Sequence, residues 1–166
     1  MDALEAIRKR RSVRSYTGEP IPREDLETII DAGRLAPTGH NKQPWDFIVV
    51  TDPDTLSELN VAATWMQQAG AVIAVVIDPA TRFWLQDSSA AVESMLIAAT
   101  ALGYGSCWLE GNTQRHEAAF KALLNVPDDK RLTTLVPIGV PTDWPTRDKR
   151  SLEDVLHWES YRGSTP

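Results

Sequence analysis

Gly70-Ala71-Val72-Ile73-Ala74-Val75-Val76-Ile77 is a continuous apolar run of strand length near the middle of the chain. A strand with one face in water alternates apolar and polar residues, whereas this run has no polar member. The run therefore predicts a central β-strand that is covered on both faces. The segments on either side of it must supply that cover.

The segments before this run predict two helices and one strand. Residues 23–35 place their apolar side chains on one helical stripe, and Pro37 stops that helix. Residues 45–50 read as a strand. Asp52 and Pro53 then open a second helix, which we expect to run to about residue 68.

The segment after the run predicts a long helix over residues 85–102. Between Ala90 and Leu102 its only polar members are Glu93, Ser94 and Thr100. A helix that is apolar nearly all round must be buried on all sides. In a chain this short one layer of neighbours is too little, so we expect this helix to lie in a subunit interface, where its alanines allow close approach.

The last third of the chain predicts shorter elements. We expect a short strand over residues 105–111, a helix over 113–125, a strand over 132–140 and a short helix over 152–158. Pro137 lacks a backbone N–H, which argues for an edge strand or an irregularity.

Length and composition favour a single domain over residues 1–166. The chain is 42% hydrophobic, enough for one substantial core. It has no apolar stretch near the ~20 residues of a membrane span and no signal-peptide core, so we expect a soluble, cytoplasmic protein with no membrane partner. Cys107 is the only cysteine, which rules out an internal disulfide.

Positive charge is concentrated in Arg8-Lys9-Arg10-Arg11-Ser12-Val13-Arg14, which holds five cations and one hydroxyl. The chain carries a net charge of −6, and without these five cations the remainder would carry −11. Arginine forks and a serine hydroxyl suit a phosphate group. The alternative is a solvated helix end whose basic residues are well placed at its C-terminus.

Several chemistries do not fit the sequence. His40, His116 and His157 lie far apart and none has metal-ligand spacing, so we expect no metal site. The chain has neither the GxGxxG loop of dinucleotide-binding folds nor the P-loop of nucleotidases. Cys107 lies in an apolar stretch and is better explained as a core residue than as a nucleophile.

Four segments, in order along the chain, resemble the FMN-dependent nitroreductase family. They are Arg10-Arg11-Ser12-Val13-Arg14, the polar loop from Ala36 to Trp45, the Gly103-to-Gly111 stretch, and the late basic loop around Arg147-Asp148-Lys149-Arg150 before Leu152. The resemblance covers essentially the whole chain. It implies an α+β fold in which a mostly antiparallel central sheet is wrapped by helices, and an intertwined homodimer with one FMN in each of two clefts at the subunit interface.

The resemblance also implies which residues hold FMN. Arg10 and Ser12, with help from Arg11, would bind the phosphate or the ribityl chain, and Arg14 would approach the N1/O2 side of the flavin. The backbone around Glu110 and Gly111 would face N5 and O4, so no side chain is expected to be catalytic. The other expected contacts are Pro37, Thr38, Gly39 and Asn41 from the opposite subunit, and Arg147 with Lys149 or Arg150 at the phosphate.

The activity implied is that of an NAD(P)H-dependent oxidoreductase working by a ping-pong cycle. NADH or NADPH would reduce FMN, and a small acceptor such as a nitroaromatic or a quinone would then take the electrons. Reduction pushes negative charge toward N1 and O2, so a fixed cation such as Arg14 would stabilise reduced flavin. Trp65, Phe83 and Trp84 either stack near the flavin or pack at a surface or interface.

Two other functions stay open from the sequence. The protein could bind FMN for storage, sensing or flavin breakdown, with little NAD(P)H turnover. The basic segment could instead anchor a nucleic acid, but the acidic remainder and the lack of a basic and aromatic platform argue against nucleic-acid binding.

Overall fold

A four-stranded antiparallel sheet forms the centre of the structure, a computed structural model that describes residues 1–161. Its strands are β1 (Trp45–Val50), β2 (Ala71–Ile77), β3 (Gly105–Ser106) and β4 (Arg131–Gly139), in the order β1-β2-β4-β3. All residues of β2 are buried, and the strand lies inside the sheet. The central strand predicted from the apolar run is confirmed.

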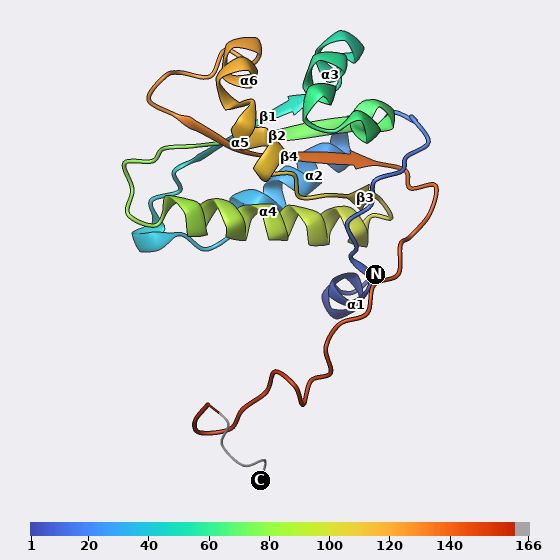
Figure 1. Cartoon of the computed structure of the whole chain (residues 1–166), viewed down its shortest axis with the longest axis vertical. Coiled ribbons are helices and arrows are strands. Elements are labelled where there is room, and N and C mark those ends of the chain that lie inside the picture. The colour runs from blue at the N-terminus through green and yellow to red at the C-terminus, as the bar shows by residue number, and fades with distance from the viewer. Residues whose placement is uncertain (162–166) are drawn as a thin grey trace.

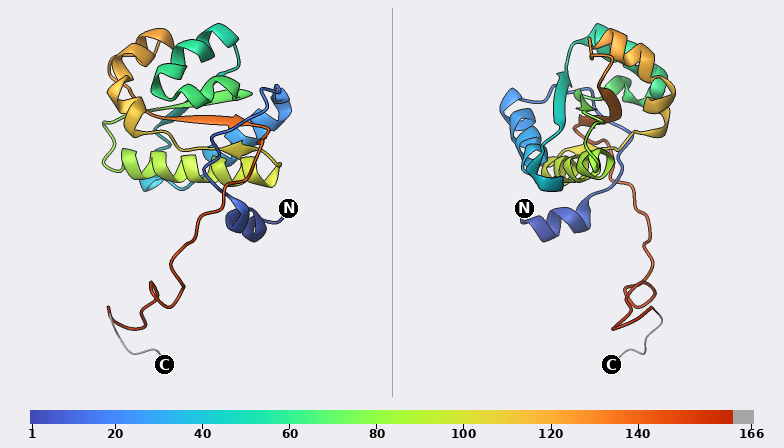
Figure 2. Two further views of the ribbon diagram at one scale, coloured as in Figure 1. Left: turned by 45° about the vertical axis from the view of Figure 1, so that its right-hand side comes forward. Right: turned by 90° about the vertical axis from the view of Figure 1, so that its left-hand side faces the viewer.

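Helices cover both faces of this sheet (Figures 1 and 2). On one face lie α2 (Arg23–Arg34) and α4 (Trp84–Ala101), and on the other lie α3 (Pro53–Leu59), α5 (Gly111–Arg115) and α6 (Glu117–Leu123). Alternate residues of β2 pack into two separate cores. Ala71, Ile73 and Val75 face α2 and α4, while Val72, Ala74 and Val76 face α3 and α6. The predicted fold, an antiparallel sheet wrapped by helices, is confirmed.

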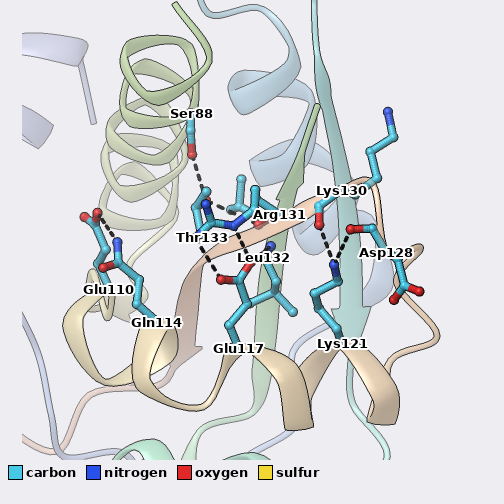
Figure 3. Close-up of polar contacts among 11 residues, drawn as sticks. Ser88, Glu110, Gln114, Glu117, Lys121, Asp128, Lys130, Arg131, Leu132 and Thr133 are labelled. Carbon is cyan, nitrogen blue, oxygen red and sulfur yellow. Dashed lines mark hydrogen bonds and ion pairs between the residues drawn. The ribbon is translucent and has the colours of Figure 1, made fainter. Parts of the chain in front are cut away.

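A β-bulge at Thr133 determines which side chains of β4 face each of the two cores. The register between β2 and β4 shifts after Val75, so that Thr133 has no partner in the ladder. Its hydroxyl instead donates to the carbonyl of Val75 at 3.3 Å and pairs with the hydroxyl of Ser88 at 2.9 Å (Figure 3). The bulge lets Leu132 and Leu135 reach the core beneath α6.

Glu117 fastens α6 to β4. Its carboxylate accepts hydrogen bonds from both Nε and a terminal nitrogen of Arg131 at 2.8 Å, and from the backbone N–H of Leu132 at 3.0 Å (Figure 3). One turn later, Lys121 donates to the carbonyls of Asp128 and Lys130. The helix is therefore held at both ends to the start of the same strand.

Pro137 does not lie in an edge strand, so of the two alternatives inferred from the sequence the edge strand is wrong, whereas β4 does contain an irregularity, the bulge at Thr133. Strand β4 lies between β2 and β3. The carbonyl of Pro137 accepts from the N–H of Cys107 at 3.2 Å. In an antiparallel sheet the N–H and the carbonyl of one residue point to the same neighbouring strand. The N–H that Pro137 lacks would therefore point toward Cys107, where β3 has already ended at Ser106, so no bond of the β3–β4 ladder is lost.

Three predicted elements are shorter or differently divided, and a fourth is not formed. The helix expected to reach residue 68 ends at Leu59, because Ala63 is extended (φ −165°, ψ 111°) and only 3₁₀ turns follow. The helix expected over residues 113–125 is divided between α5 and α6 at His116 (φ −111°, ψ 12°). The strand expected over 105–111 is only β3, although Leu109 forms a bridge to Leu135. Residues 152–158 form turns, so the helix predicted there is wrong.

Helix α4 is buried on its sheet side and half-buried on the other. Val92, Met95 and Ala99 are fully buried, whereas Ala90, Ile97 and other residues of the opposite stripe keep partial exposure. Within residues 1–161, no helix combines the length and apolar character needed to cross a bilayer.

The two ends of the described chain leave the body on the same side. Helix α1 (Ala3–Lys9) lies against α4, and residues 142–161, which we call the C-terminal arm, extend past α1 away from the sheet (Figures 1 and 2). The arm begins where the N–H of Thr142 donates to the carbonyl of Ser15 at 3.1 Å.

Candidate functional site

Helix α1 delivers the basic segment and ends within it. The Asp2 carboxylate caps the helix by accepting from the N–H of Glu5 at 2.8 Å. At the other end, Arg11 donates to the carbonyls of Arg8 and Arg10 at 2.7 Å. This arginine therefore closes the helix C-terminus, which satisfies carbonyls that would otherwise lack partners.

Val13 orients the cationic side chains that follow. It is fully buried, and its N–H donates to the carbonyl of Ser106 at 2.9 Å. A Cβ on Gly105 would lie 2.7 Å from Val13 Cγ1, so only glycine allows the two segments to pack this closely. With Val13 inside, Ser12 and Arg14 on either side of it point outward.

The hydroxyl of Tyr16 reinforces this arrangement. It donates to the carbonyl of Val13 at 2.8 Å, and burial raises the pKa of Tyr16, which keeps the phenol neutral. The basic segment is thus fixed to the sheet by buried neutral groups, and its charges are left for another partner.

The first part of the C-terminal arm lies beside the basic segment, and together they line a cationic cavity of about 320 Å³. The cavity combines five cations with the hydroxyl of Ser12, and its lining consists of Arg10, Arg11, Ser12, Arg14, Pro145, Arg147 and Lys149. Only Arg10 among these has a carboxylate partner in the described chain, with its Nε 3.3 Å from Glu93 Oε1. The arrangement is an anion site with an excess of positive charge.

The structure thus brings together most of the predicted phosphate contacts. Arg147 and Lys149 face Arg10, Ser12 and their neighbours although they lie more than 130 residues away in sequence. Arg150, the alternative considered with Lys149, does not line the cavity. Pro145 lines it and was not predicted, because an apolar ring carries no signal for anion binding.

Glu110 and Gly111 lie on the continuation of the strand that pairs with the basic segment. Glu110 is the fourth residue after Ser106, so at most about 14 Å of chain separates them. The Glu110 carboxylate accepts from Trp108 Nε1 at 3.1 Å. It also accepts from Gln114 Nε2 at 2.9 Å (Figure 3). Within residues 1–161, the backbone N–H groups of Glu110 and Gly111 donate to no other group. These two donors are therefore available to a ligand.

The loop with Pro37, Thr38, Gly39 and Asn41 lies elsewhere in the same chain. Its Gly39 N–H donates to Asp87 in the first turn of α4 at 3.0 Å. The basic segment packs beside Gly105 and Ser106, which follow the other end of this helix (Figure 1). None of the four loop residues lines the cationic cavity of its own chain, whose Arg10 pairs with Glu93, six residues beyond Asp87 on α4.

The aromatic residues considered as flavin contacts have partners within the chain. The guanidinium of Arg14 lies 5.9 Å from the ring centroid of Trp65, and that of Arg131 lies 5.8 Å from Trp84. Phe83 packs on Gly39. Cys107 is buried, as predicted for a core residue, and burial raises the pKa of its thiol.

A larger cavity, of about 480 Å³, lies between α2 and the β1 edge of the sheet. Its lining is mainly apolar, with Ile21, Leu26 and Val49 among its members, and its cation, Arg23, is paired with Glu27 at 2.7 Å. It offers no excess charge for a phosphate, unlike the smaller cationic cavity.

Comparison with known proteins gives the family. The model of the nitroreductase family matches residues 7–81 and 60–140. A protein of Archaeoglobus fulgidus provisionally named NADH dehydrogenase/NAD(P)H nitroreductase is 39% identical over 173 residues, which cover 96% of this chain and 99% of the relative. A protein of the same name from Methanothermobacter thermautotrophicus is 33% identical, over 97% of this chain and 88% of its own length.

Solved structures agree. A Bacteroides thetaiotaomicron protein of that provisional name has a TM-score of 0.88 and 29% identity, covering 96% of this chain and 98% of that one. A nitroreductase from Bacteroides fragilis, crystallised with bound FMN, has a TM-score of 0.79 and 26% identity, covering 92% of this chain and 95% of that one. The fold, the order of the motifs and these relatives lead to one conclusion: the chain belongs to the nitroreductase family.

Proposed function

We propose that this protein is an FMN-dependent oxidoreductase that uses NADH or NADPH to reduce a small electron acceptor. One observation carries the proposal: five cations and a serine hydroxyl, drawn from both ends of the chain, line a single cavity. A phosphate with two negative charges and several acceptor oxygens matches this lining in charge and in hydrogen-bonding capacity.

The residues present fit FMN. Arg10, Ser12, Arg147 and Lys149 would hold the phosphate end, with Arg11 contributing charge while one of its nitrogens closes α1. Arg14 would face the N1/O2 side of the ring. The free N–H groups of Glu110 and Gly111 would serve N5 and O4, and the bonds from Trp108 and Gln114 to the Glu110 side chain hold that backbone in place.

The protein's own contribution is position and charge. Bound FMN would supply the redox chemistry, taking a hydride from the nicotinamide and passing electrons to the acceptor in a second half-reaction. Arg14 would stabilise the negative charge that reduction creates, and it is oriented by Trp65 and by its bond to the Ser12 carbonyl at 3.3 Å. No side chain is required to transfer a proton.

Relatives support the donor and the class of acceptor. The Archaeoglobus protein carries NAD(P)H in its name, and a Pseudomonas protein that is 28% identical over 95% of this chain is named a chromium(VI) reductase. Nitroaromatics, quinones and oxidising ions are thus the acceptors to test, with electrons delivered by a ping-pong cycle.

We further propose a homodimer with FMN at the subunit interface. No residue from Pro37 to Asn41 lines the cationic cavity of its own chain, so a second copy is the simplest source of that loop at each site. The half-buried stripe of α4 offers a surface for such contact.

The test is the colour of the purified protein and its response to the two donors. We expect yellow protein with one FMN per chain, and bleaching within seconds when NADH or NADPH is mixed in anaerobically. Colourless protein that takes up no added FMN would refute the proposal. Yellow protein that neither donor bleaches would instead favour a flavin-binding role without turnover.

A further inference from the structure

The loop from Thr38 to Gln43 has a costly backbone conformation. His40, Asn41 and Gln43 all have positive φ, at 54°, 55° and 47°. Residues other than glycine avoid this region of backbone conformation. Three such residues among the four positions 40–43 keep it only when the surrounding structure holds them. Within the loop, the hydroxyl of Thr38 accepts from the N–H of Gln43 at 3.2 Å. Further local bonds join the loop's own backbone groups and the side chains of Gln43 and Asn41. All of these bonds lie within the loop, so none of them attaches it to the rest of the chain.

The first turn of α4 supplies the restraints that attach the loop to the rest of the chain. Asp87 is 4% exposed, and its Oδ1 accepts from the N–H of Gly39 at 3.0 Å. Its second oxygen, Oδ2, is buried and has no partner within residues 1–161. Phe83, one turn earlier, packs so closely on Gly39 that a Cβ there would lie 2.5 Å from the ring.

A buried carboxylate is costly unless it serves a partner. Among the described residues, the loop is the only hydrogen-bond partner of the Asp87 carboxylate, so what the carboxylate secures is the position of the loop. A hydrogen bond to an ionised acceptor is stronger than one between neutral groups, which suits a strained segment.

We infer that Asp87 is a positioning residue for FMN, and that it acts on the flavin site of the partner subunit. The inference rests on the proposed function, in which Gly39 and its neighbours contact the FMN of the opposite subunit. Asp87 touches no flavin itself. It fixes the Gly39 backbone at the first turn of α4, while the cationic cavity of its own chain is lined by no residue of that loop and meets α4 at Glu93, the partner of Arg10.

Three variants separate this role from general stability. Asp87→Ala removes the acceptor of the Gly39 N–H, and Asp87→Asn keeps an oxygen that can accept it. Ser88→Ala is the control: it removes a buried hydrogen bond of the adjacent residue, which joins Thr133 in β4 and not the loop. We expect Asp87→Ala to weaken FMN binding about tenfold or more, since one charge-assisted hydrogen bond holding the loop is lost.

The Asn variant should stay within about threefold of the original Kd, because its amide oxygen still accepts. Ser88→Ala should lower the melting temperature without changing the Kd. At saturating FMN, the visible circular dichroism of the flavin should change only in Asp87→Ala, because only there is the loop displaced. If Asp87→Ala binds FMN as the parent protein does, the inference is wrong.

Action on the partner's site is tested in heterodimers. Copies carrying Asp87→Ala and copies carrying Arg10→Ala with Ser12→Ala are co-expressed with different tags, and the mixed dimer is purified by both tags. If each site takes its cations from one subunit and its loop from the other, one site of the mixed dimer has both parts intact. We then expect half of the FMN to bind with the parent Kd.

If Asp87 acted within its own subunit, each site of the mixed dimer would keep one defect, and no site with the parent Kd would appear; that result overturns the inference. An unmutated protein that bound no FMN would refute the proposed function as well. Should Asp87→Ala fail to fold, Gly39→Ala replaces it in the same mixture, because the added Cβ meets Phe83 and displaces the loop from the other side.

Discussion

At the scale of single residues, the site depends on a few neutral groups that fix the direction of charged ones. Val13 is buried between Ser12 and Arg14, and Gly105 leaves room for it. Because Val13 faces the sheet, the side chains of Ser12 and Arg14 on either side of it face the cavity. Charge alone would not produce a site, since exposed cations are ordinarily solvated.

Replacing Arg10 and Ser12 together by alanine should give nearly colourless protein. Both residues line the cationic cavity, and hydrogen bonds to a charged group are each worth ~1.5 to 3 kcal/mol, so we expect FMN to bind at least about a hundredfold more weakly. Titration of FMN into flavin-free protein measures this. Arg8→Ala is the matched control, because Arg8 belongs to the same basic run but does not line the cavity. Full flavin occupancy in the double variant would mean that the phosphate lies elsewhere.

Much of the cationic cavity could be predicted, because residue type and order along the chain carry the signal for phosphate binding. Asp87 could not. Its bond to Gly39 joins residues 48 positions apart, and an acidic residue near a helix start is ordinarily explained by the helix dipole. The split between the cationic cavity and the Gly39 loop also needed coordinates, since it depends on the length and direction of α4.

A pH-dependent prediction concerns the bond between Glu117 and Arg131. Pairing with Arg131 lowers the pKa of Glu117 below its ordinary value of 4.5. The carboxylate therefore contributes stability that is fully present above that value and is lost as pH falls through the lower, folded-state pKa. We expect Glu117→Gln to lose about 1 to 2 kcal/mol of unfolding free energy at neutral pH.

This difference should shrink as the pH falls below 4.5, because the parent protein then loses its ionised carboxylate too. Denaturant unfolding from pH 7 to pH 3 measures it. Glu27→Gln is the control, since Glu27 pairs with Arg23 in full exposure and such pairs contribute little. A Glu117→Gln deficit that stays constant over the whole pH range would show that packing, not charge, accounts for it.

At the scale of elements, the sheet and its two helical layers follow from periodicity, and the errors have local causes. A continuous apolar run predicted β2 because both faces of that strand are covered. Pro137 does not make β4 an edge strand, because the cost of a missing N–H depends on which neighbour it faces. The expected helix to residue 68 failed at Ala63, whose extended backbone no propensity signals.

The crossing of α2 and α4 depends on Gly33. A Cβ there would lie 2.7 Å from Met95 Cγ and 3.4 Å from the carbonyl oxygen of Ala91, and Met95 is fully buried. We expect Gly33→Ala to destabilise the protein by about 1 to 3 kcal/mol through overpacking, although alanine favours a helix by about 1 kcal/mol.

Urea unfolding followed by circular dichroism tests this. Combining Gly33→Ala with Met95→Ala should cost less than the sum of the two single changes, because the smaller side chain makes room for the new methyl group. Gly111→Ala serves as the control for stability, since its Cβ would meet no atom within 4 Å. Strict additivity in the double variant would refute the proposed contact.

At the scale of the whole molecule, apolar side chains are exposed on α1 and on the C-terminal arm, where we propose that the second copy packs. Leu4 and Ile7 of α1 are 62% and 52% exposed, and the C-terminal arm exposes Leu152, Leu156 and Trp158. The arm extends away from the body of its own chain (Figure 2). These side chains lie on the same side of the molecule as the cationic cavity, so assembly and cofactor binding should be coupled.

Removing residues 151–166 should therefore disrupt both dimer and flavin. The truncation keeps Arg147 and Lys149, so the cations of the cavity are still present. We expect the parent protein to have twice the 18.4 kDa mass of one chain, and the truncated protein to be largely monomeric and to bind FMN weakly. Light scattering and FMN titration on the same samples measure both properties. Lys149→Ala is the matched control: it should weaken FMN binding while the dimer persists, because it removes a cavity charge and leaves the apolar arm intact. A truncated protein that is dimeric and fully yellow would show that the second copy is held by α1 and α4 alone.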